Sequence, residues 1–320
     1  MALVAGGAPW RAEAQQPAAS QPGWTPPMTP WGEPDLRGIW PLNHLISTPF
    51  QRPERFGERR VLTDEEYAAA QKTAEARNAR FLSGAIPQAD AGQATRQTSL
   101  LVDPPNGRFP ELTPRGKALY DAMRGSYKPG QTVFDSPDDF DSWDRCITRG
   151  LPVSMLPRNY NNGVRITQFP GYVVILLEMA HEARIIPTAA RPPLDGAIRQ
   201  YLGESRGRWE GNTLVVETTN FNGRTAMTNA GVPGSPPLTP SSPNMRFVER
   251  FTRTAADTID YQMTVEDPEI LTTGTWSAAF PLQRDDDYEI YEYACHEGNT
   301  AIRNYIETSR FERAPKKPLP

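Results

Sequence analysis

Nine short segments between residues 164 and 294 are rich in β-branched and apolar residues, and together they constrain the fold most strongly. Turn-forming pairs such as Pro170-Gly171 and Gly211-Asn212 separate several of them, which is typical of β-hairpins. The pattern indicates one inserted helix, over residues 195–202. The nine predicted strands cover residues 164–168, 172–179, 183–188, 206–209, 213–219, 246–253, 258–265, 275–282 and 288–294.

The close spacing of these segments predicts antiparallel strands. Residues 258–265 alternate between polar and apolar side chains, which indicates one solvent-facing and one buried face. Regular antiparallel strands commonly close into a barrel or pack as a sandwich, because both arrangements protect their edges. We expect a mainly β fold: an antiparallel meander closed into a lipocalin-like barrel, with a few short helices and an extended, Pro-rich N-terminal arm.

Local signals place the helices. Thr63 and Glu66 form a capping box that predicts a surface helix over residues 64–82. Thr113-Pro114 and Ser136 each begin a further short helix.

The sequence divides into five expected segments. A remnant of an export signal (1–14) is followed by an extended Pro/Trp-rich arm (15–62) and by short helices and loops packed on the barrel (63–145). The barrel (146–299) carries a flap (222–244) over one mouth, and a C-terminal helix and tail (300–320) pack across the barrel.

The N-terminus and the cysteines both indicate export. Residues 2–8 are small and apolar, and Ala12-Glu13-Ala14 fits a cleavage site, although no basic segment precedes them. An ordinary tail is the alternative. In an oxidising compartment Cys146 and Cys295 would form a disulfide. The alternative is that both remain buried free thiols. We therefore expect a periplasmic or secreted protein.

Charge and motifs exclude several classes of protein. The net charge of −4 argues against a nucleic-acid binder, which needs a basic surface. There is no run of 18 apolar residues, so no transmembrane segment is expected. The nucleophile elbow, the P-loop and the dinucleotide fingerprint are missing, which disfavours α/β-hydrolases, kinases and Rossmann dehydrogenases. We expect no cofactor, and no tight histidine spacing supports a metal site. The oligomeric state is left open.

Several segments resemble a large family of exported bacterial proteins with many copies in soil genomes. They are Leu101–Arg108 with Leu112–Pro114, Asp144–Pro152, His181–Ile186, Gly207–Val216 and Tyr293–Asn299. The resemblance covers nearly all of residues 31–312. It implies export and a single architectural unit, and it supplies no catalytic residues because no activity is settled for the family.

Histidine is scarce, and two of the three precede a glutamate: His181-Glu182 and His296-Glu297. Histidine is the side chain best suited to move protons near neutral pH. The strand pattern predicts that His181 points into the core, as an acid or base or as a structural residue. If the cysteines pair, His296 and Glu297 come close to Arg149 at a polar mouth, whose structural alternative is an ion-pair network.

Further polar residues are candidates to orient or bind a ligand. Tyr160 and Asn162 precede the first strand and could bind a ligand oxygen, although turn chemistry explains the asparagine equally well. Arg184 is the third orienting residue. The remaining candidate ligand-binding residues are Arg165, Glu178 and Glu182, for which a solvated cross-strand pair is the alternative.

The sequence therefore predicts an exported enzyme that binds a small, largely apolar organic molecule in a β-barrel and acts by general acid/base chemistry. A lyase, an isomerase or cyclase, and a hydrolase all fit this description. The first alternative is a non-catalytic carrier of an apolar ligand. The second is a carbohydrate-binding surface module that uses Trp24, Trp31 and Trp40.

Overall fold

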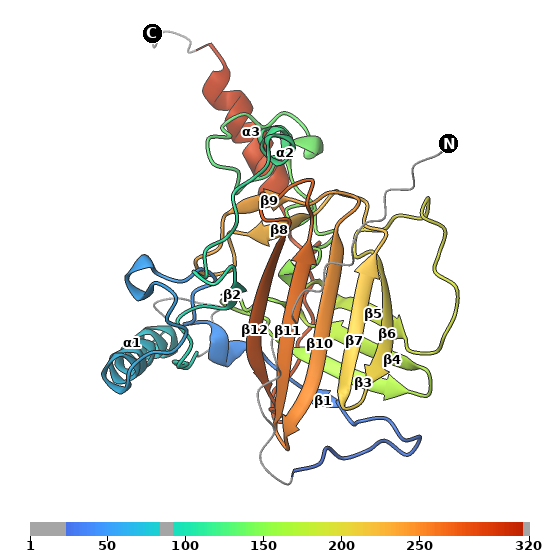
Figure 1. The fold of residues 1–320 in the computed structure, drawn as a ribbon. Coiled ribbons are helices and arrows are strands. Elements are labelled where there is room, and N and C mark those ends of the chain that lie inside the picture. Colours follow the sequence, from blue (N-terminus) through green and yellow to red (C-terminus); the bar gives the residue numbers. More distant parts are fainter. Residues whose placement is uncertain (1–23, 84–91, 316–320) are drawn as a thin grey trace, which may run out of the picture.

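The structure, a computed structural model, describes residues 24–83 and 92–315. The expected export signal, the start of the arm and the end of the tail lie outside the described residues. Ten of the described strands form two antiparallel sheets (Figure 1). One sheet has the order β1 (Gly38–Ile39), β3 (Val164–Phe169), β4 (Tyr172–Leu177) and β5 (Glu182–Pro187); the other has the order β2 (Leu101–Asp103), β12 (Thr275–Gln283), β11 (Thr258–Glu266), β10 (Arg246–Ala255), β7 (Thr213–Thr219) and β6 (Glu204–Glu210).

The mainly β, antiparallel prediction is confirmed, but a closed barrel is not. Strands β5 and β6 are edge strands that lie beside each other, and no ladder of hydrogen bonds joins them among the described residues. They touch near one end, where a Cβ on Gly207 would lie 3.1 Å from Cγ2 of Ile186. Neither sheet closes on itself, so the meander is divided into a four-stranded and a six-stranded layer.

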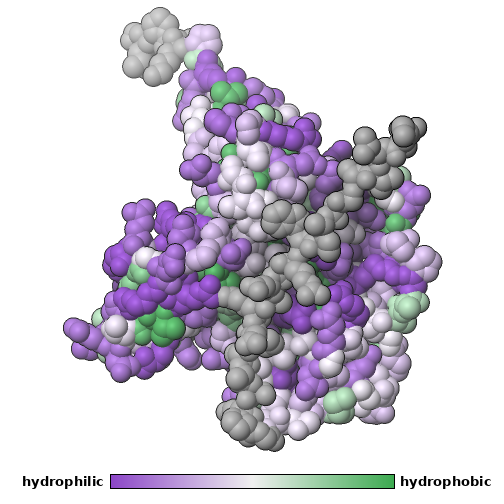
Figure 2. All heavy atoms as spheres, in the orientation of Figure 1, coloured by the Kyte–Doolittle hydropathy of each residue, from purple (hydrophilic) through white to green (hydrophobic). Residues whose placement is uncertain are grey.

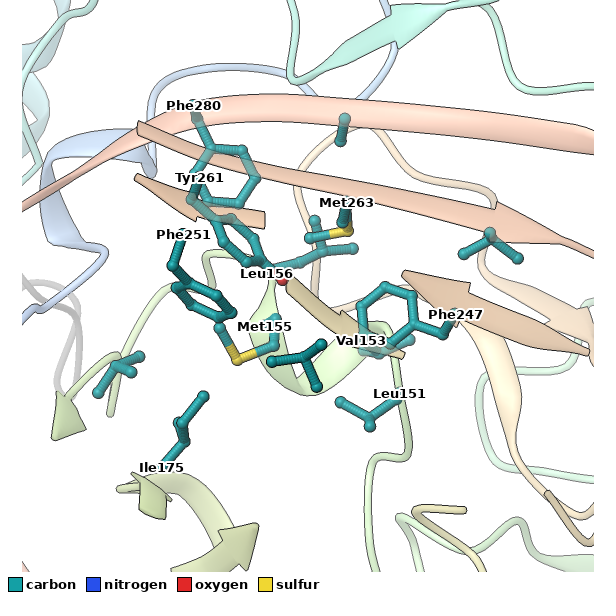
Figure 3. Close-up of a cluster of buried hydrophobic side chains, with 14 of the residues drawn as sticks. Leu151, Val153, Met155, Leu156, Ile175, Phe247, Phe251, Tyr261, Met263 and Phe280 are labelled. Atoms are coloured by element: carbon teal, nitrogen blue, oxygen red, sulfur yellow. The ribbon is translucent and has the colours of Figure 1, made fainter. Parts of the chain in front are cut away.

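The hydrophobic core fills the space between the two sheets, which we call the interior. Phe247, Phe251 and Met263 of the six-stranded sheet face Ile175 of the other sheet (Figure 3). Residues 151–156, including the 3₁₀ turn η4 (Val153–Met155), run between them and are fully buried. Each such side chain stabilises the fold by roughly 2 kcal/mol. The chain's own side chains thus occupy the space that a ligand-binding barrel leaves open.

The alternation predicted for residues 258–265 is confirmed, because Ile259, Tyr261, Met263 and Val265 are buried. The predicted ninth strand is wrong. Residues 288–294 are irregular, and they contact the body through polar groups instead of a strand ladder. The predicted helix over residues 195–202 is also absent, and a turn occupies that segment.

The segment over residues 222–244 is more ordered than an open flap. It contains a two-stranded sheet of β8 (Ala226–Asn229) and β9 (Leu238–Pro240). Met227 and Val232 belong to the main hydrophobic core. This Pro-rich segment therefore leaves the sheet but packs against the body of the protein through its apolar side chains.

The helices largely follow the capping signals. Helix α1 (Asp64–Leu82) begins after Thr63, and α2 (Pro114–Ala122) begins after Thr113, whose hydroxyl accepts a hydrogen bond from the amide of Gly116. The signal at Ser136 gives only a 3₁₀ turn, η3 (Pro137–Asp139). The other 3₁₀ turns are η1 (Asn43–Leu45), η2 (Glu54–Phe56) and η5 (Met179–His181). Among the described residues, no helix has both the length and the apolar character of a membrane span.

Helix α3 (Ala301–Arg313) does not pack across the sheets as expected. Its Tyr305 packs on Phe134 with ring centroids 5.1 Å apart, and its Ser309 hydroxyl accepts a hydrogen bond from the amide of Phe134. In Figure 1 the helix stands beyond the ends of the strands. Figure 2 shows a mostly hydrophilic surface on this side of the molecule, with a small hydrophobic area beside α1.

The N-terminal arm is fixed to the body by an aromatic residue. Trp40 is fully buried, and its indole N–H donates to the carbonyl of Leu36. Because Trp40 is inaccessible, it cannot serve as the sugar platform considered from the sequence. Trp24 and Trp31 are partly exposed.

Candidate functional site

A large groove lies beside the Cys146–Cys295 disulfide, and we call it the acidic groove. Its volume is about 1080 Å³, slightly above the range that is usual for ligand pockets. The lining residues come from three parts of the chain: Trp143, Asp144, Cys146, Tyr160, Asn161, Glu178, Asp285, Asp287, Tyr288, Glu289, Tyr291, Glu292, Tyr293, Ala294, Cys295, Glu297, Gly298 and Asn299.

The irregular segment 285–299 forms one wall of the acidic groove, and Glu178 holds it. The buried Glu178 carboxylate accepts hydrogen bonds from the Tyr288 hydroxyl at 2.7 Å and from the Tyr291 amide at 3.2 Å. Its other contacts are with Asn161 and the amide of Gly163. Glu178 therefore uses its lone pairs on the protein itself, as an anchor of the groove wall.

The predicted disulfide is confirmed, and it is the covalent anchor of the same wall. The sulfur atoms of Cys146 and Cys295 are bonded, and the two residues are 149 positions apart in sequence. Cys146 follows a turn that includes Trp143 and Asp144, both of which line the groove. The disulfide thus joins the two sides of the acidic groove, and part of the polar mouth expected from the sequence forms around it.

Three aromatic rings follow one another along the groove. The ring of Tyr293 lies 5.7 Å from that of Trp143 and 6.3 Å from that of Tyr160. The hydroxyls of the two tyrosines are 3.5 Å apart. Burial and the neighbouring Tyr160 raise the pKa of Tyr293, so the Tyr293 phenol is neutral near pH 7. Neutral rings of this kind offer faces that attract cations.

The charges in the lining have one sign. Among the residues that the structure describes, seven of those lining the groove are Asp or Glu, and none is Lys, Arg or His. Within the part of the chain that the structure describes, none of these seven carboxylates takes part in an ion pair. A concave surface with one sign of charge focuses its field and concentrates ions of the opposite sign. The acidic groove therefore favours cations.

One carboxyl behind the groove has a perturbed pKa. Burial and the adjacent Asp144 raise the pKa of Asp141 to about 6. Its Oδ1 accepts hydrogen bonds from the amides of Trp143 and Asp144, each at 2.8 Å. Asp144 in turn accepts from the amide of Ser126 at 2.8 Å. The sequence analysis did not identify Asp141, because a residue pattern does not reveal burial.

His181 does not lie in the core, where the sequence predicts it. Strand β4 ends at Leu177, and Ala180 and His181 adopt positive φ values in a turn. His181 is consequently exposed, and its Nε2 accepts a hydrogen bond from the Tyr293 amide at 2.7 Å. The prediction that it points into the core is wrong. It lies at the edge of the acidic groove instead.

The residues expected around the disulfide are separated. Glu297 lines the groove, while His296 is exposed and is not part of the lining. Arg149 is buried, with its guanidinium 3.8 Å from the ring centroid of Trp143 and its Nη1 donating to Asn229. Burial lowers the pKa of Arg149. Arg149 forms no ion pair with the other described residues, so it does not join the ion-pair network considered as the alternative; it supports the aromatic wall from behind.

Two of the candidate orienting residues lie near the groove in different roles. Tyr160 lines it. Asn162 is buried, and its side-chain amide both accepts from the amide and donates to the carbonyl of Arg158. Sequence reasoning missed Arg158, which is buried among backbone carbonyls, and burial lowers its pKa to about 9. Arg165 is exposed and does not line the groove.

Arg184 and Glu182 lie in the interior. The Arg184 guanidinium pairs with Glu249, with one N–O distance of 2.9 Å, and Tyr261 donates to the same carboxylate at 2.8 Å. Burial raises the pKa of Tyr261 well above its ordinary value. Glu182 accepts from the Ser154 hydroxyl at 2.7 Å. These polar groups are buried and pair mainly with one another, so the sequence candidates do not converge on one site.

The described residues contain no group of three or more His, Cys, Asp and Glu side chains placed to hold a metal ion. Comparison with family models, with curated proteins and with solved structures finds no match. The acidic groove is therefore the candidate functional site of the described chain.

Proposed function

We propose that this protein binds a small organic cation in the acidic groove. The observation that carries the proposal is the combination of seven carboxylates with aromatic rings in one large concavity, whose lining among the described residues has no basic side chain. A cation over the face of Tyr or Trp gains about 0.5–2 kcal/mol, and nearby carboxylates add longer-range attraction. This ligand class differs from the largely apolar molecule expected from the sequence.

Export to the periplasm or beyond is part of the proposal. The disulfide supports it, because disulfides persist in oxidising compartments. The resemblance to exported bacterial proteins points in the same direction. The functional class would then be an extracytoplasmic protein that captures a cationic solute.

A matched pair of probes tests the ligand class. Choline and 3,3-dimethylbutan-1-ol have nearly the same shape, and only choline carries a charge. We expect choline to bind at least about tenfold more tightly, or ~1.4 kcal/mol, in isothermal titration calorimetry at low salt. Higher salt should weaken choline binding, because exposed charges are screened beyond about 10 Å at 0.1 M. Equal affinities for the two probes would refute the cation proposal.

Matched variants locate the binding. Asp287→Asn with Glu292→Gln removes two exposed carboxylates of the groove, and we expect choline binding to weaken about tenfold. Glu65→Gln with Glu75→Gln removes two exposed carboxylates from α1 and should leave the affinity unchanged. A similar loss in both double variants would mean that only the net charge of the protein matters.

Acid/base catalysis is a second proposal, with Asp141 as the proton-transfer group. Its support is the carboxyl pKa of about 6 beside a groove residue, since perturbed groups of this kind cluster at functional sites. Asp141→Asn should then abolish turnover of a cationic substrate while choline affinity stays within about threefold. Full turnover in Asp141→Asn would eliminate this role.

A further inference from the structure

A second cavity lies at the seam between the edge strands β5 and β6, and we call it the seam pocket. Its volume is about 520 Å³, within the range of ligand pockets. Its walls are the edge of β5, the start of β6 and the connecting segment 191–203. The pocket exists because the two strands lie side by side without a ladder of hydrogen bonds between them.

The wall of the seam pocket is apolar at its entrance. The side chain of Ile185 is 65% exposed and that of Leu194 is 43% exposed, and both line the pocket. Leu202 lines it as well and packs against the hydrophobic core. Large apolar side chains that remain exposed at a concave surface gain free energy when an apolar group covers them.

The polar side chains of the seam pocket have more hydrogen-bond donors than acceptors available to a ligand. Glu204 already accepts hydrogen bonds from the Leu194 amide and from Arg206, so its carboxylate is occupied. Arg184 binds Glu249 and Ser205 through its terminal nitrogens, but its buried Nε has no hydrogen-bond partner within the described chain. A buried donor without a partner is energetically costly, and an acceptor atom of a ligand would remove that cost.

A positively charged side chain, that of Arg191, lies at the entrance of the seam pocket. Arg191 lines the pocket, is exposed and forms no ion pair within the residues described; its guanidinium lies 5.9 Å from the centre of the Tyr172 ring. The complementary ligand therefore combines an apolar tail with an anionic group that accepts hydrogen bonds. We propose that the seam pocket binds a medium-chain carboxylate, with the tail on Ile185, Leu194 and Leu202 and the carboxylate toward Arg191 and the Nε of Arg184.

Octanoate is the probe, with octan-1-ol as the neutral control. We expect calorimetry to show one octanoate site per chain, and at least about tenfold weaker binding of octan-1-ol. Arg191→Gln should weaken octanoate binding about tenfold, whereas Arg208→Gln, the same change on an exposed arginine of β6, should leave it unchanged. Choline binding in the acidic groove should be unaffected by either change, which separates this test from that of the proposed function.

A second pair of variants does not depend on arginine. Ile185→Glu places a negative charge at the exposed entrance and should abolish octanoate binding, whereas Ile185→Val should retain it. No octanoate binding to the wild-type protein, or equal binding in Arg191→Gln and Arg208→Gln, would overturn the proposal. Unchanged binding in Ile185→Glu would overturn it as well.

Discussion

The interior and the acidic groove treat charge in opposite ways. In the interior, the buried Glu249 carboxylate pairs with Arg184 and accepts a hydrogen bond from Tyr261, between packed apolar side chains. In the groove, carboxylates such as Asp287 and Glu292 face solvent without an ion pair among the described residues. The difference teaches that this meander fills its enclosed space with stabilising contacts, whereas the proposed cation site lies on an irregular segment at its edge.

The largest expected effect concerns the disulfide that fixes the groove wall. Replacing both Cys146 and Cys295 by Ser should lower the free energy of unfolding by roughly 5 kcal/mol in the chain-entropy model, because the closed loop is long. Urea unfolding of the wild-type and double-variant proteins under non-reducing conditions measures the loss. A loss below about 1 kcal/mol would show that the wall holds without the covalent link.

The next prediction concerns the stability that the buried Arg184–Glu249 pair of the interior contributes. Glu249→Gln leaves the buried Arg184 charge without its partner and should cost about 3–5 kcal/mol of stability. The control is Glu217→Gln, which breaks the more exposed pair with Arg246 and should cost less than about 1 kcal/mol. Equal losses in the two variants would contradict the claim that burial makes the Arg184–Glu249 pair the more costly one to break.

Replacing Asp141 should raise the free energy of unfolding at neutral pH, whereas the two preceding substitutions lower it. Its pKa is raised from 3.8 to about 6 in the folded protein, so the folded state holds the proton more tightly than the unfolded state. This group therefore lowers stability as pH rises from about 4 to 6, by about 3 kcal/mol. Asp141→Asn keeps the Oδ1 acceptor and should raise stability at pH 7, with little change below pH 4.

Denaturant unfolding of both proteins at pH 3.5, 5 and 7 checks this sign. The stability of the variant should exceed that of the wild-type protein increasingly with pH. A variant that is less stable than wild-type at pH 7 would mean that the Asp141 carboxylate is stabilising when ionised.

The smallest stability effect is expected in the groove. Asp287→Asn with Glu292→Gln alters two exposed side chains, so the free energy of unfolding should change by less than about 0.5 kcal/mol. The same variant should lose choline affinity, which separates recognition from folding. A thermal melt beside the calorimetric titration distinguishes the two quantities.

Local signals in the sequence predicted much of the fold and little of the site. Alternation and turn residues were sufficient for most strands, and Thr63 and Thr113 were sufficient to begin α1 and α2. The filling of the interior was not predictable, because residues 151–156 enter it through long-range packing. His181 was misplaced because a turn with positive φ reverses its direction, and Glu178 became an anchor through contacts more than 100 residues away in sequence.

The most direct test of the contrast is to locate a bound cation by NMR. Backbone amide shifts of isotopically labelled protein would be recorded during titration with choline. The account predicts shifts in residues 143–146, 160–163 and 285–299, which surround the acidic groove. Shifts confined to residues 151–156, 247–251 and 261–263 would place the ligand in the interior and contradict the account.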